Sequence, residues 1–235
     1  MESLQGKIAV ITGVSGGIGK SLAEQLLEQG CKVYGIGRNN TLSADNYTFI
    51  KTDVRNIDEV NAAFEHIYAA PEKRVDFLIN NAGLGYFGYL ESMPLEEWKQ
   101  MYDTNVNGLF YCTRCVLGPM KLQGSGHIIN ISSIAGLEGY QQVAGYCSTK
   151  FAVRGLSDAL YKEVRDYGVK VTCIYPGSVK TDFFKNSPSI KAHDYMLMPE
   201  DVAQMIVHTL STPANFHQVH LEIRPLMPRG PQKNT

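Results

Sequence analysis

The chain has 235 residues, of which 44% are hydrophobic and 19% are charged, a balance typical of a globular protein with a full core. Its formal net charge of −1 gives no electrostatic basis for binding nucleic acid or an anionic membrane. No apolar run reaches the roughly 18 residues of a membrane span, and the first residues lack the pattern of a secretion signal, so we expect a cytoplasmic protein that does not cross a membrane.

Short apolar runs alternate with amphipathic segments along the chain. Runs rich in Val, Ile, Phe and Tyr predict buried parallel strands, and they lie at 7–13, 31–37, 47–53, 75–83, 126–132, 169–177 and 219–226. Helical spacing predicts helices over 19–30, 56–70, 94–120 and 144–167. The alternation predicts a doubly wound α/β sheet with helices on both faces, a Rossmann fold. No linker or repeat divides the chain, so we expect a single domain over 1–235, with 228–235 as a frayed tail.

A glycine-rich turn joins the first predicted strand to the first predicted helix. Gly13, Gly17 and Gly19 have the spacing G-x-x-x-G-x-G. Glycine permits a tight turn and lets a pyrophosphate approach the backbone, where exposed N–H groups and the helix dipole hold the anion. The strand before the turn and the helix after it favour a nucleotide site over a merely flexible turn.

The end of the second predicted strand indicates which nucleotide is bound. An NAD site usually has an acidic side chain there, which bonds the ribose hydroxyls, but here Gly37 is followed by Arg38. The small residue leaves room for a 2′-phosphate, and a guanidinium can bind it with two N–H groups. NADP(H) is therefore the expected cofactor and NAD(H) the less favoured one, while a merely solvated arginine is the alternative. Asp53, at the end of the third predicted strand, fits an acceptor for the adenine amino group, a helix cap, or both.

Two of the five cysteines, Cys112 and Cys115, form a C-x-x-C pattern. That pattern occurs in redox sites and in halves of zinc sites. No second cysteine pair accompanies it, and the surrounding residues predict a helix interior, where cysteine behaves as a small hydrophobic side chain. We therefore expect no metal site.

Tyr146 and Lys150 lie four residues apart in a run with helical spacing, so their side chains share one helix face. An ammonium beside a phenol favours the phenolate, which would prepare the tyrosine for proton transfer near neutral pH. Such a pair alone is more often an ordinary surface contact, so its interpretation depends on the other motifs.

Six motifs resemble those of the short-chain dehydrogenase/reductase family, in the family's order. They are TGVSGGIG at 12–19, NNAG at 80–83, NVNG at 105–108, INISSIAG at 129–136, YCSTK at 146–150 and PGSVKTD at 176–182. The resemblance extends from Lys7 to about Pro225. It implies a seven-stranded parallel sheet, a nicotinamide cofactor and hydride transfer that interconverts a carbonyl compound and a secondary alcohol.

The resemblance implies four catalytic residues, Ser133, Tyr146, Lys150 and Asn105. Tyr146 would exchange a proton with the substrate oxygen, and Ser133 would orient that oxygen. Lys150 would favour the phenolate and hold the nicotinamide ribose, and Asn105 would help to bind a water of a proton relay. Of two adjacent serines we choose Ser133 over Ser132, because it lies 13 residues before Tyr146, as in the family, and successive side chains of a strand point in opposite directions.

The same resemblance implies the residues that bind the cofactor. Val179 would contact the nicotinamide carboxamide, while Asn80 and Asn81 could equally be structural bridges between strands. The implied set is Gly13, Ser15, Gly17, Ile18, Gly19, Arg38, Asp53, Val54, Asn81, Ala82, Gly83, Tyr146, Lys150, Pro176, Gly177, Val179 and Thr181.

The substrate is less well indicated by the sequence. Aromatic residues in the loops at 84–90, 136–140 and 182–196 are candidates for an apolar pocket: Tyr86, Phe87, Tyr140, Phe183 and Phe184. The C-terminal segment over 198–228 resembles that of bacterial short-chain enzymes that act on small 3-hydroxy acids or on a range of carbonyl compounds.

The resemblance also implies a partner, because the long helices near 94–120 and 144–167 commonly form the dimer faces of family members. A homo-oligomer, dimer or tetramer, is therefore expected. The leading function is an NADP(H)-dependent oxidoreductase that acts on a small-molecule carbonyl or alcohol. One alternative is an NADP-binding sensor or scaffold without turnover, which the intact Tyr146 and Lys150 disfavour. The other is an NAD-preferring alcohol or 3-hydroxy acid dehydrogenase.

Overall fold

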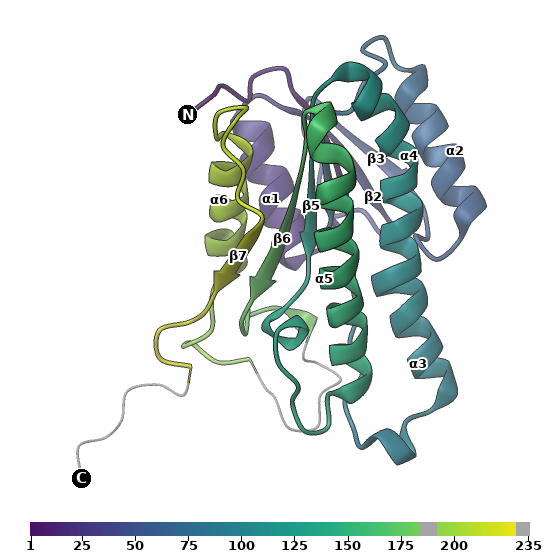
Figure 1. The fold of residues 1–235 in the computed structure, drawn as a ribbon, viewed down its shortest axis with the longest axis vertical. Helices are drawn as coiled ribbons and strands as arrows, with labels where there is room; N and C mark the ends of the chain where they lie inside the picture. Colours follow the sequence, from purple (N-terminus) through teal and green to yellow (C-terminus); the bar gives the residue numbers. More distant parts are fainter. Residues whose placement is uncertain (184–191, 229–235) are drawn as a thin grey trace.

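A computed structural model describes residues 1–183 and 192–228 as one parallel sheet with helices on both faces (Figure 1). The strand order is β3-β2-β1-β4-β5-β6-β7, and all neighbours pair in parallel. The predicted doubly wound, seven-stranded sheet is confirmed, and each predicted run contains one strand. The strands are β1 (Ile8–Thr12), β2 (Lys32–Gly37), β3 (Tyr47–Lys51), β4 (Phe77–Asn80), β5 (Gly126–Ile131), β6 (Val169–Pro176) and β7 (His220–Ile223).

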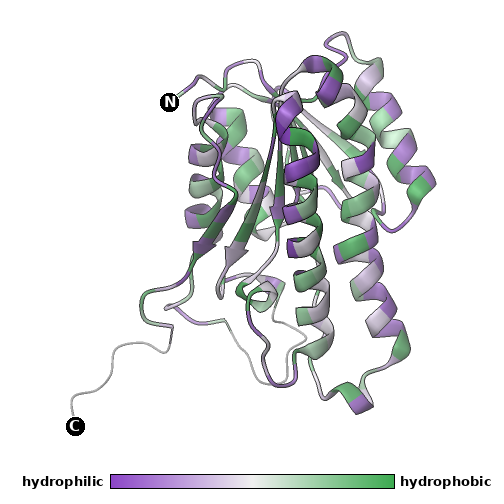
Figure 2. Ribbon diagram, viewed as in Figure 1, coloured by the Kyte–Doolittle hydropathy of each residue, from purple (hydrophilic) through white to green (hydrophobic). Residues whose placement is uncertain are grey.

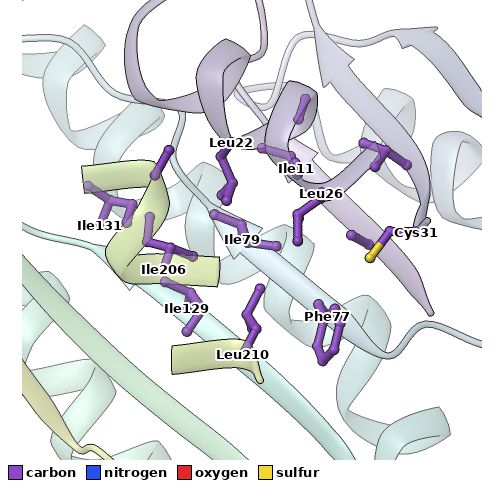
Figure 3. Packing of buried hydrophobic residues seen from close by; sticks show 14 of the residues in the cluster. Ile11, Leu22, Leu26, Cys31, Phe77, Ile79, Ile129, Ile131, Ile206 and Leu210 are labelled. Carbon is purple, nitrogen blue, oxygen red and sulfur yellow. The ribbon is translucent and has the colours of Figure 1, made fainter. Parts of the chain in front are cut away.

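Each face of the sheet has its own buried layer. Helices α1 (Gly17–Glu28) and α6 (Pro199–Leu210) cover one face, and α2 (Ile57–Ala69), α4 (Gly108–Gln123) and α5 (Ala144–Val164) cover the other (Figure 1). On the α1 side, Leu22, Leu26 and Ile206 pack against Ile11 and Ile79 of the sheet (Figure 3). Because both faces are covered, the central strands β1, β4 and β5 are largely apolar while the helices keep a polar outer side (Figure 2).

The chain changes direction across the sheet between β1 and β4. Strands β2 and β3 lie on one side of β1, and β4 to β7 continue on the other. Such a switch point leaves a crevice at the carboxyl ends of the strands, where ligands of this fold class bind. The motifs at 12–19, 80–83, 129–136 and 176–182 all follow or overlap the carboxyl ends of strands, so the fold gathers them at one edge.

The long helix predicted over 94–120 is interrupted by a π segment. Helix α3 (Leu95–Tyr102) runs into π residues Asp103–Asn107 and continues as α4, with the Gly108 N–H bonded to the Asp103 carbonyl. Single π turns inside α-helices are rare and are frequent at functional sites. Asn105, one of the four implied catalytic residues, lies in this turn.

Two sets of expectations fall partly outside the described residues. These are the frayed tail beyond Pro228 and the candidate pocket residue Phe184. In the described ranges, no helix combines the length and the apolar character needed to cross a membrane.

A buried imidazole lies on β5, away from the carboxyl edge. His127 is 4% exposed, and its Nε2 lies 2.8 Å from the hydroxyl of Thr172 on β6. Since that hydroxyl donates to the Gln218 carbonyl at 2.6 Å, it must accept from Nε2–H, which makes His127 the neutral Nε2–H tautomer. Burial lowers the pKa of His127 well below its ordinary value, and burial also lowers the pKa of neighbouring His217.

We predict that the free energy of unfolding falls as the pH is lowered from about 7 to about 5. As the pH passes below the ordinary histidine pKa of 6.5, the unfolded chain takes up a proton that buried His127 refuses, so the unfolded state gains stability. One such proton contributes a slope of up to about 1.4 kcal/mol per pH unit. Urea unfolding at a series of pH values measures the slope.

His127→Gln keeps a donor for Thr172 and should remove part of that slope. Exposed His66, on α2, provides the matched control, and His66→Gln should leave the slope as in the wild type. An unchanged slope in His127→Gln would contradict the prediction.

Candidate active site

A cavity of about 730 Å³ lies at the carboxyl ends of the strands. Its walls come from the glycine loop after β1, from the ends of β2 to β6 and from the start of α5. Among the implied site residues, only Gly19 and Asn105 lie outside the lining. Those that line the cavity are Gly13, Ser15, Gly17, Ile18, Arg38, Asp53, Val54, Asn81, Ala82, Gly83, Ser133, Tyr146, Lys150, Pro176, Gly177, Val179 and Thr181.

The glycine loop packs too closely for side chains at two positions. Gly13 has φ of +76°, and a Cβ there would lie 2.9 Å from Cα of Ala82. A Cβ on Gly19 would lie 2.3 Å from the Gly13 carbonyl oxygen, so Gly19 shapes the loop from behind the cavity wall. No side chain caps the N-terminus of α1 at Gly16, which leaves its first N–H groups at the cavity. This cradle fits a pyrophosphate.

Asn81 ties the glycine loop to the end of β4. Its side-chain amide donates to the carbonyls of Thr12 at 2.9 Å and Gly13 at 3.0 Å. In return, the Thr12 hydroxyl accepts from the N–H groups of Asn81 at 3.0 Å and Ala82 at 2.9 Å. Asn80 bonds Thr113 of α4 at 3.0 Å and Asn130 of β5 at 2.8 Å. Both asparagines therefore bridge neighbouring elements, which was the structural alternative for them.

At the far end of the cavity two arginines follow β2 and β3. Arg38 is exposed at the end of β2 and lines the cavity. The Arg55 guanidinium grips the Asp53 carboxylate at 2.6 to 3.1 Å, and this hydrogen-bonded pair lowers the pKa of Asp53. The cap of α2 is Asn56, so the capping alternative for Asp53 is wrong. That Asp53 binds adenine stays a prediction, and its carboxylate is already paired with Arg55.

Tyr146 and Lys150 lie on one face of α5 and are both buried, at 7% and 5% exposure. The Lys150 Nζ lies 5.6 Å from the centroid of the Tyr146 ring and donates to the Ile131 carbonyl, at the end of β5, at 2.9 Å. The predicted sharing of a helix face is therefore seen, together with a tie from α5 to the sheet.

Burial dominates the electrostatics of this pair. It raises the pKa of the Tyr146 phenol well above its ordinary value, against the opposing effect of a hydrogen bond with Ser133. It also lowers the pKa of Lys150 to about 8. This differs from the expectation that the ammonium would set a low pKa for the phenol, because both groups lose the solvent that would stabilise their charged forms.

The two adjacent serines have different environments. Ser132 is 3% exposed, and its hydroxyl donates to the Lys150 carbonyl at 3.0 Å, so it anchors α5. The Ser133 hydroxyl accepts from the Ala135 N–H at 3.1 Å, so its own proton is available to another acceptor, and the Ser133 side chain opposes the rise in the pKa of Tyr146. The geometry therefore favours Ser133 over Ser132 as the group that would meet a substrate oxygen.

The side chain of Asn105 links two of the segments that form the site. Its side chain accepts from the Leu84 N–H at 2.9 Å and donates to the Leu84 carbonyl at 2.8 Å and to the Thr149 hydroxyl at 3.0 Å. Thr149 lies between Tyr146 and Lys150 on α5, so Asn105 joins the helix that carries them to the loop after β4. A role in a water relay stays a prediction.

Several residues of the site were not identified from the sequence. Arg55 lies two positions after Asp53. The nearness of an arginine to the implied adenine site was the feature of the sequence that could have identified it. Thr149 lies inside the YCSTK motif, but nothing in the sequence pairs it with Asn105. The anchoring bond of Ser132 to the Lys150 carbonyl depends on tertiary packing, which the sequence does not indicate.

Among the aromatic candidates, Phe87, Tyr140 and Phe183 line the cavity. Tyr86 turns away, and its hydroxyl donates to Gln100 of α3 at 2.9 Å. Within the described ranges, no group of three or more His, Cys, Asp or Glu side chains is placed to hold a metal ion. Cys112 is wholly buried in the core, as expected for a small hydrophobic residue.

The order of the motifs and the geometry of the cavity agree with a comparison to known families. A family model described as short chain dehydrogenase matches residues 7–191. The chain belongs to the short-chain dehydrogenase family. It is therefore an oxidoreductase, with the family's nucleotide-binding fold.

Relatives and solved structures resemble it over nearly its whole length. An uncharacterized oxidoreductase of Staphylococcus aureus is 36% identical, over 96% of this chain and all of the relative. The closed form of a serine dehydrogenase complexed with NADP⁺ is 33% identical, with a TM-score of 0.84 over 97% of this chain and 98% of the other. A 3-ketoacyl-(acyl-carrier-protein) reductase from Brucella melitensis complexed with NADH is 26% identical, with a TM-score of 0.88 over 96% and 100% of the two chains.

We predict that Gly19→Ala weakens the binding of NADPH by at least about tenfold. The new methyl group would overlap the Gly13 carbonyl, so the loop backbone that we expect to face the pyrophosphate would have to shift. Titration calorimetry measures the affinity. Gly155→Ala, on α5 with open space around its Cα, is the control and should bind as the wild type does. Equal NADPH affinity of the two variants would contradict this prediction.

Proposed function

We propose that this protein is an NADP(H)-dependent oxidoreductase that interconverts a carbonyl compound and a secondary alcohol, with Tyr146 as the general acid and base. The observation that carries the proposal is the convergence of Ser133, Tyr146 and Lys150 on one wall of the cavity that the glycine loop also lines. The loop that would hold the nucleotide and the side chain that would donate the proton thus line the same cavity. The proposed reaction requires this, because hydride reaches the carbonyl carbon while the carbonyl oxygen is protonated.

The cavity supports one orientation of the cofactor. The uncapped start of α1 would hold the pyrophosphate, and Arg38 would bind the 2′-phosphate at the end of β2. Val179 and Thr181, after β6, would then flank the nicotinamide. When bound there, the nicotinamide supplies a hydride to the carbonyl carbon or accepts one from the alcohol.

The proton chemistry falls to the residues of this chain. Tyr146 would donate its hydroxyl proton to the substrate oxygen during reduction, while the Ser133 hydroxyl donates a hydrogen bond to the same oxygen. Burial raises the pKa of Tyr146, so its acid form is available at neutral pH.

Lys150 would act on Tyr146 through its charge. Its ammonium is held by the Ile131 carbonyl and lies beside the phenol ring, where it would stabilise the phenolate left after proton donation. Proton return to Tyr146 would then complete the cycle.

That α4 and α5 carry the faces of a homo-oligomer stays a prediction. Each helix leaves an aromatic ring on the surface, Phe110 on α4 at 46% exposure and Phe151 on α5 at 43%. Exposed rings of this kind support an interface with a second copy. Sedimentation velocity on the full chain distinguishes monomer from dimer or tetramer.

We predict that Tyr146→Phe lowers carbonyl reduction with NADPH by about 100-fold to 10,000-fold, the range that a positioned general acid contributes. NADPH affinity should stay within about threefold of the wild type, because the ring and its packing are kept. Absorbance at 340 nm and calorimetry measure the two quantities. Tyr161→Phe, which removes a hydroxyl farther along the same helix, should change neither. Retained turnover in Tyr146→Phe would exclude the assigned role.

We predict that Arg38→Ala weakens NADPH binding by about tenfold to 100-fold and leaves NADH binding unchanged. The guanidinium should contact only the 2′-phosphate, which NADH lacks, and hydrogen bonds to charged groups contribute about 1.5–3 kcal/mol. Arg154→Ala, which removes a half-buried arginine on α5, is the control and should change neither affinity. If the ratio of the two affinities did not change, cofactor preference would have to lie elsewhere in the cavity.

A further inference from the structure

Three aromatic rings meet at the catalytic end of the cavity. The centroid of the Phe183 ring lies 5.3 Å from that of Tyr146, and the centroid of Phe87 lies 6.1 Å from each of them. Phe87 and Phe183 meet edge to face at 81°, and both line the cavity beside the catalytic hydroxyl. Rings at these distances present faces and edges that attract a further ring.

The backbone makes room for this arrangement at Gly85. A Cβ on Gly85 would lie 2.8 Å from the ring of Phe183 and 3.1 Å from that of Phe87. A side chain at Gly85 would therefore require the ends of both rings to shift.

A fourth aromatic residue, Tyr140, lines the cavity with its polar atom already engaged. Its hydroxyl donates to the Glu138 carboxylate, which also accepts from Arg224 at 3.0 Å. Arg224 follows β7, so this contact joins the loop after β5 to the far end of the chain. Tyr140 thus offers the cavity its ring, while its hydroxyl is committed to Glu138.

The charges around the cavity separate along its length. Of the described lining residues, the cationic ones are Arg38 and Arg55 at the β2–β3 end and Lys150, whose amine bonds the Ile131 carbonyl. Beside the rings the charged lining residue is Asp182, which is exposed and would repel an anion. Lys180, nearby in sequence, pairs with Asp194 at 2.6 Å.

We propose that this end of the cavity binds an uncharged carbonyl compound that carries an aryl group, with the aryl ring packed against Phe87 and Phe183. The inference rests on the proposed function for the position of the carbonyl, next to Ser133 and Tyr146. It narrows that function to a substrate class and sets it apart from the small 3-hydroxy acids that the C-terminal segment suggested, since those carry a carboxylate.

Three methyl ketones of similar size test the inference with the full chain and NADPH. They are acetophenone, cyclohexyl methyl ketone, which replaces the aryl ring by a saturated one, and 4-acetylbenzoate, which adds a carboxylate. We expect kcat/KM for acetophenone to exceed that for the cyclohexyl ketone by at least about threefold. It should exceed that for 4-acetylbenzoate by at least about 100-fold, because an unpaired carboxylate would be desolvated there. Equal values, or a preference for the acid, would overturn the inference.

Two variants test whether the rings of Phe87 and Phe183 cause the preference for the aryl ketone. Phe183→Leu and Phe87→Leu should each reduce the acetophenone-to-cyclohexyl ratio by about twofold to tenfold, as expected for the loss of one ring contact. Phe216→Leu, which removes a ring that is 52% exposed in the loop before β7, should leave the ratio unchanged. Unaltered NADPH affinity shows that the variants are folded. An unchanged ratio in both cavity variants would contradict the assignment.

Binding separates a failure of this inference from a failure of the proposed function. If no ketone is turned over with either cofactor, the proposed function fails, and the same three ketones are titrated into Tyr146→Phe preloaded with NADPH. Tightest binding of acetophenone would still support the aryl site. Tightest binding of 4-acetylbenzoate would overturn it.

Discussion

The buried amine of Lys150 sets the constraint on which the site depends. Taking a charge out of water costs several kcal/mol unless the surroundings replace the lost solvation, and here burial lowers the pKa of this lysine to about 8. The replacement comes from the Ile131 carbonyl at the end of β5 and from the phenol of Tyr146 on the same helix. The start of α5 must therefore lie against the carboxyl end of β5, and the Ser132 bond to the Lys150 carbonyl holds it there.

A second requirement is close approach of backbone to backbone at the switch point. The ends of β1 and β4 are held together by Thr12 and Asn81, while Gly13 lies against Ala82 after β4 and Gly19 of α1 lies against the Gly13 carbonyl. This end of the cavity is thus built largely from main chain, and it depends on the absence of side chains at Gly13 and Gly19. The catalytic end is built from rings on loops, and substrate choice can vary there without disturbing the nucleotide cradle.

Much of this arrangement was predictable, for physical reasons that differ from part to part. Buried parallel strands leave continuous apolar runs, and a pair four residues apart must share a helix face, as Tyr146 and Lys150 do. The π segment at Asp103–Asn107 was not predictable, because its residues are compatible with an ordinary helix. The grip of Arg55 on Asp53 depends on the geometry of a turn, and the raised pKa of Tyr146 depends on burial by residues distant in sequence.

The division of charge along the cavity then links catalysis to selectivity. In the proposed orientation the cofactor phosphates would lie at the end that carries Arg38 and Arg55, which leaves Lys150 as the cation between the cofactor and the rings among the described lining residues. A substrate carboxylate placed beside Tyr146 would compete with the phenolate for that single ammonium. It would thereby raise the pKa of the phenol further and oppose the charge that develops when the proton leaves. If Tyr146 and Lys150 move the proton as proposed, the same buried pair would therefore disfavour an anionic substrate, and the same desolvation would account for both properties.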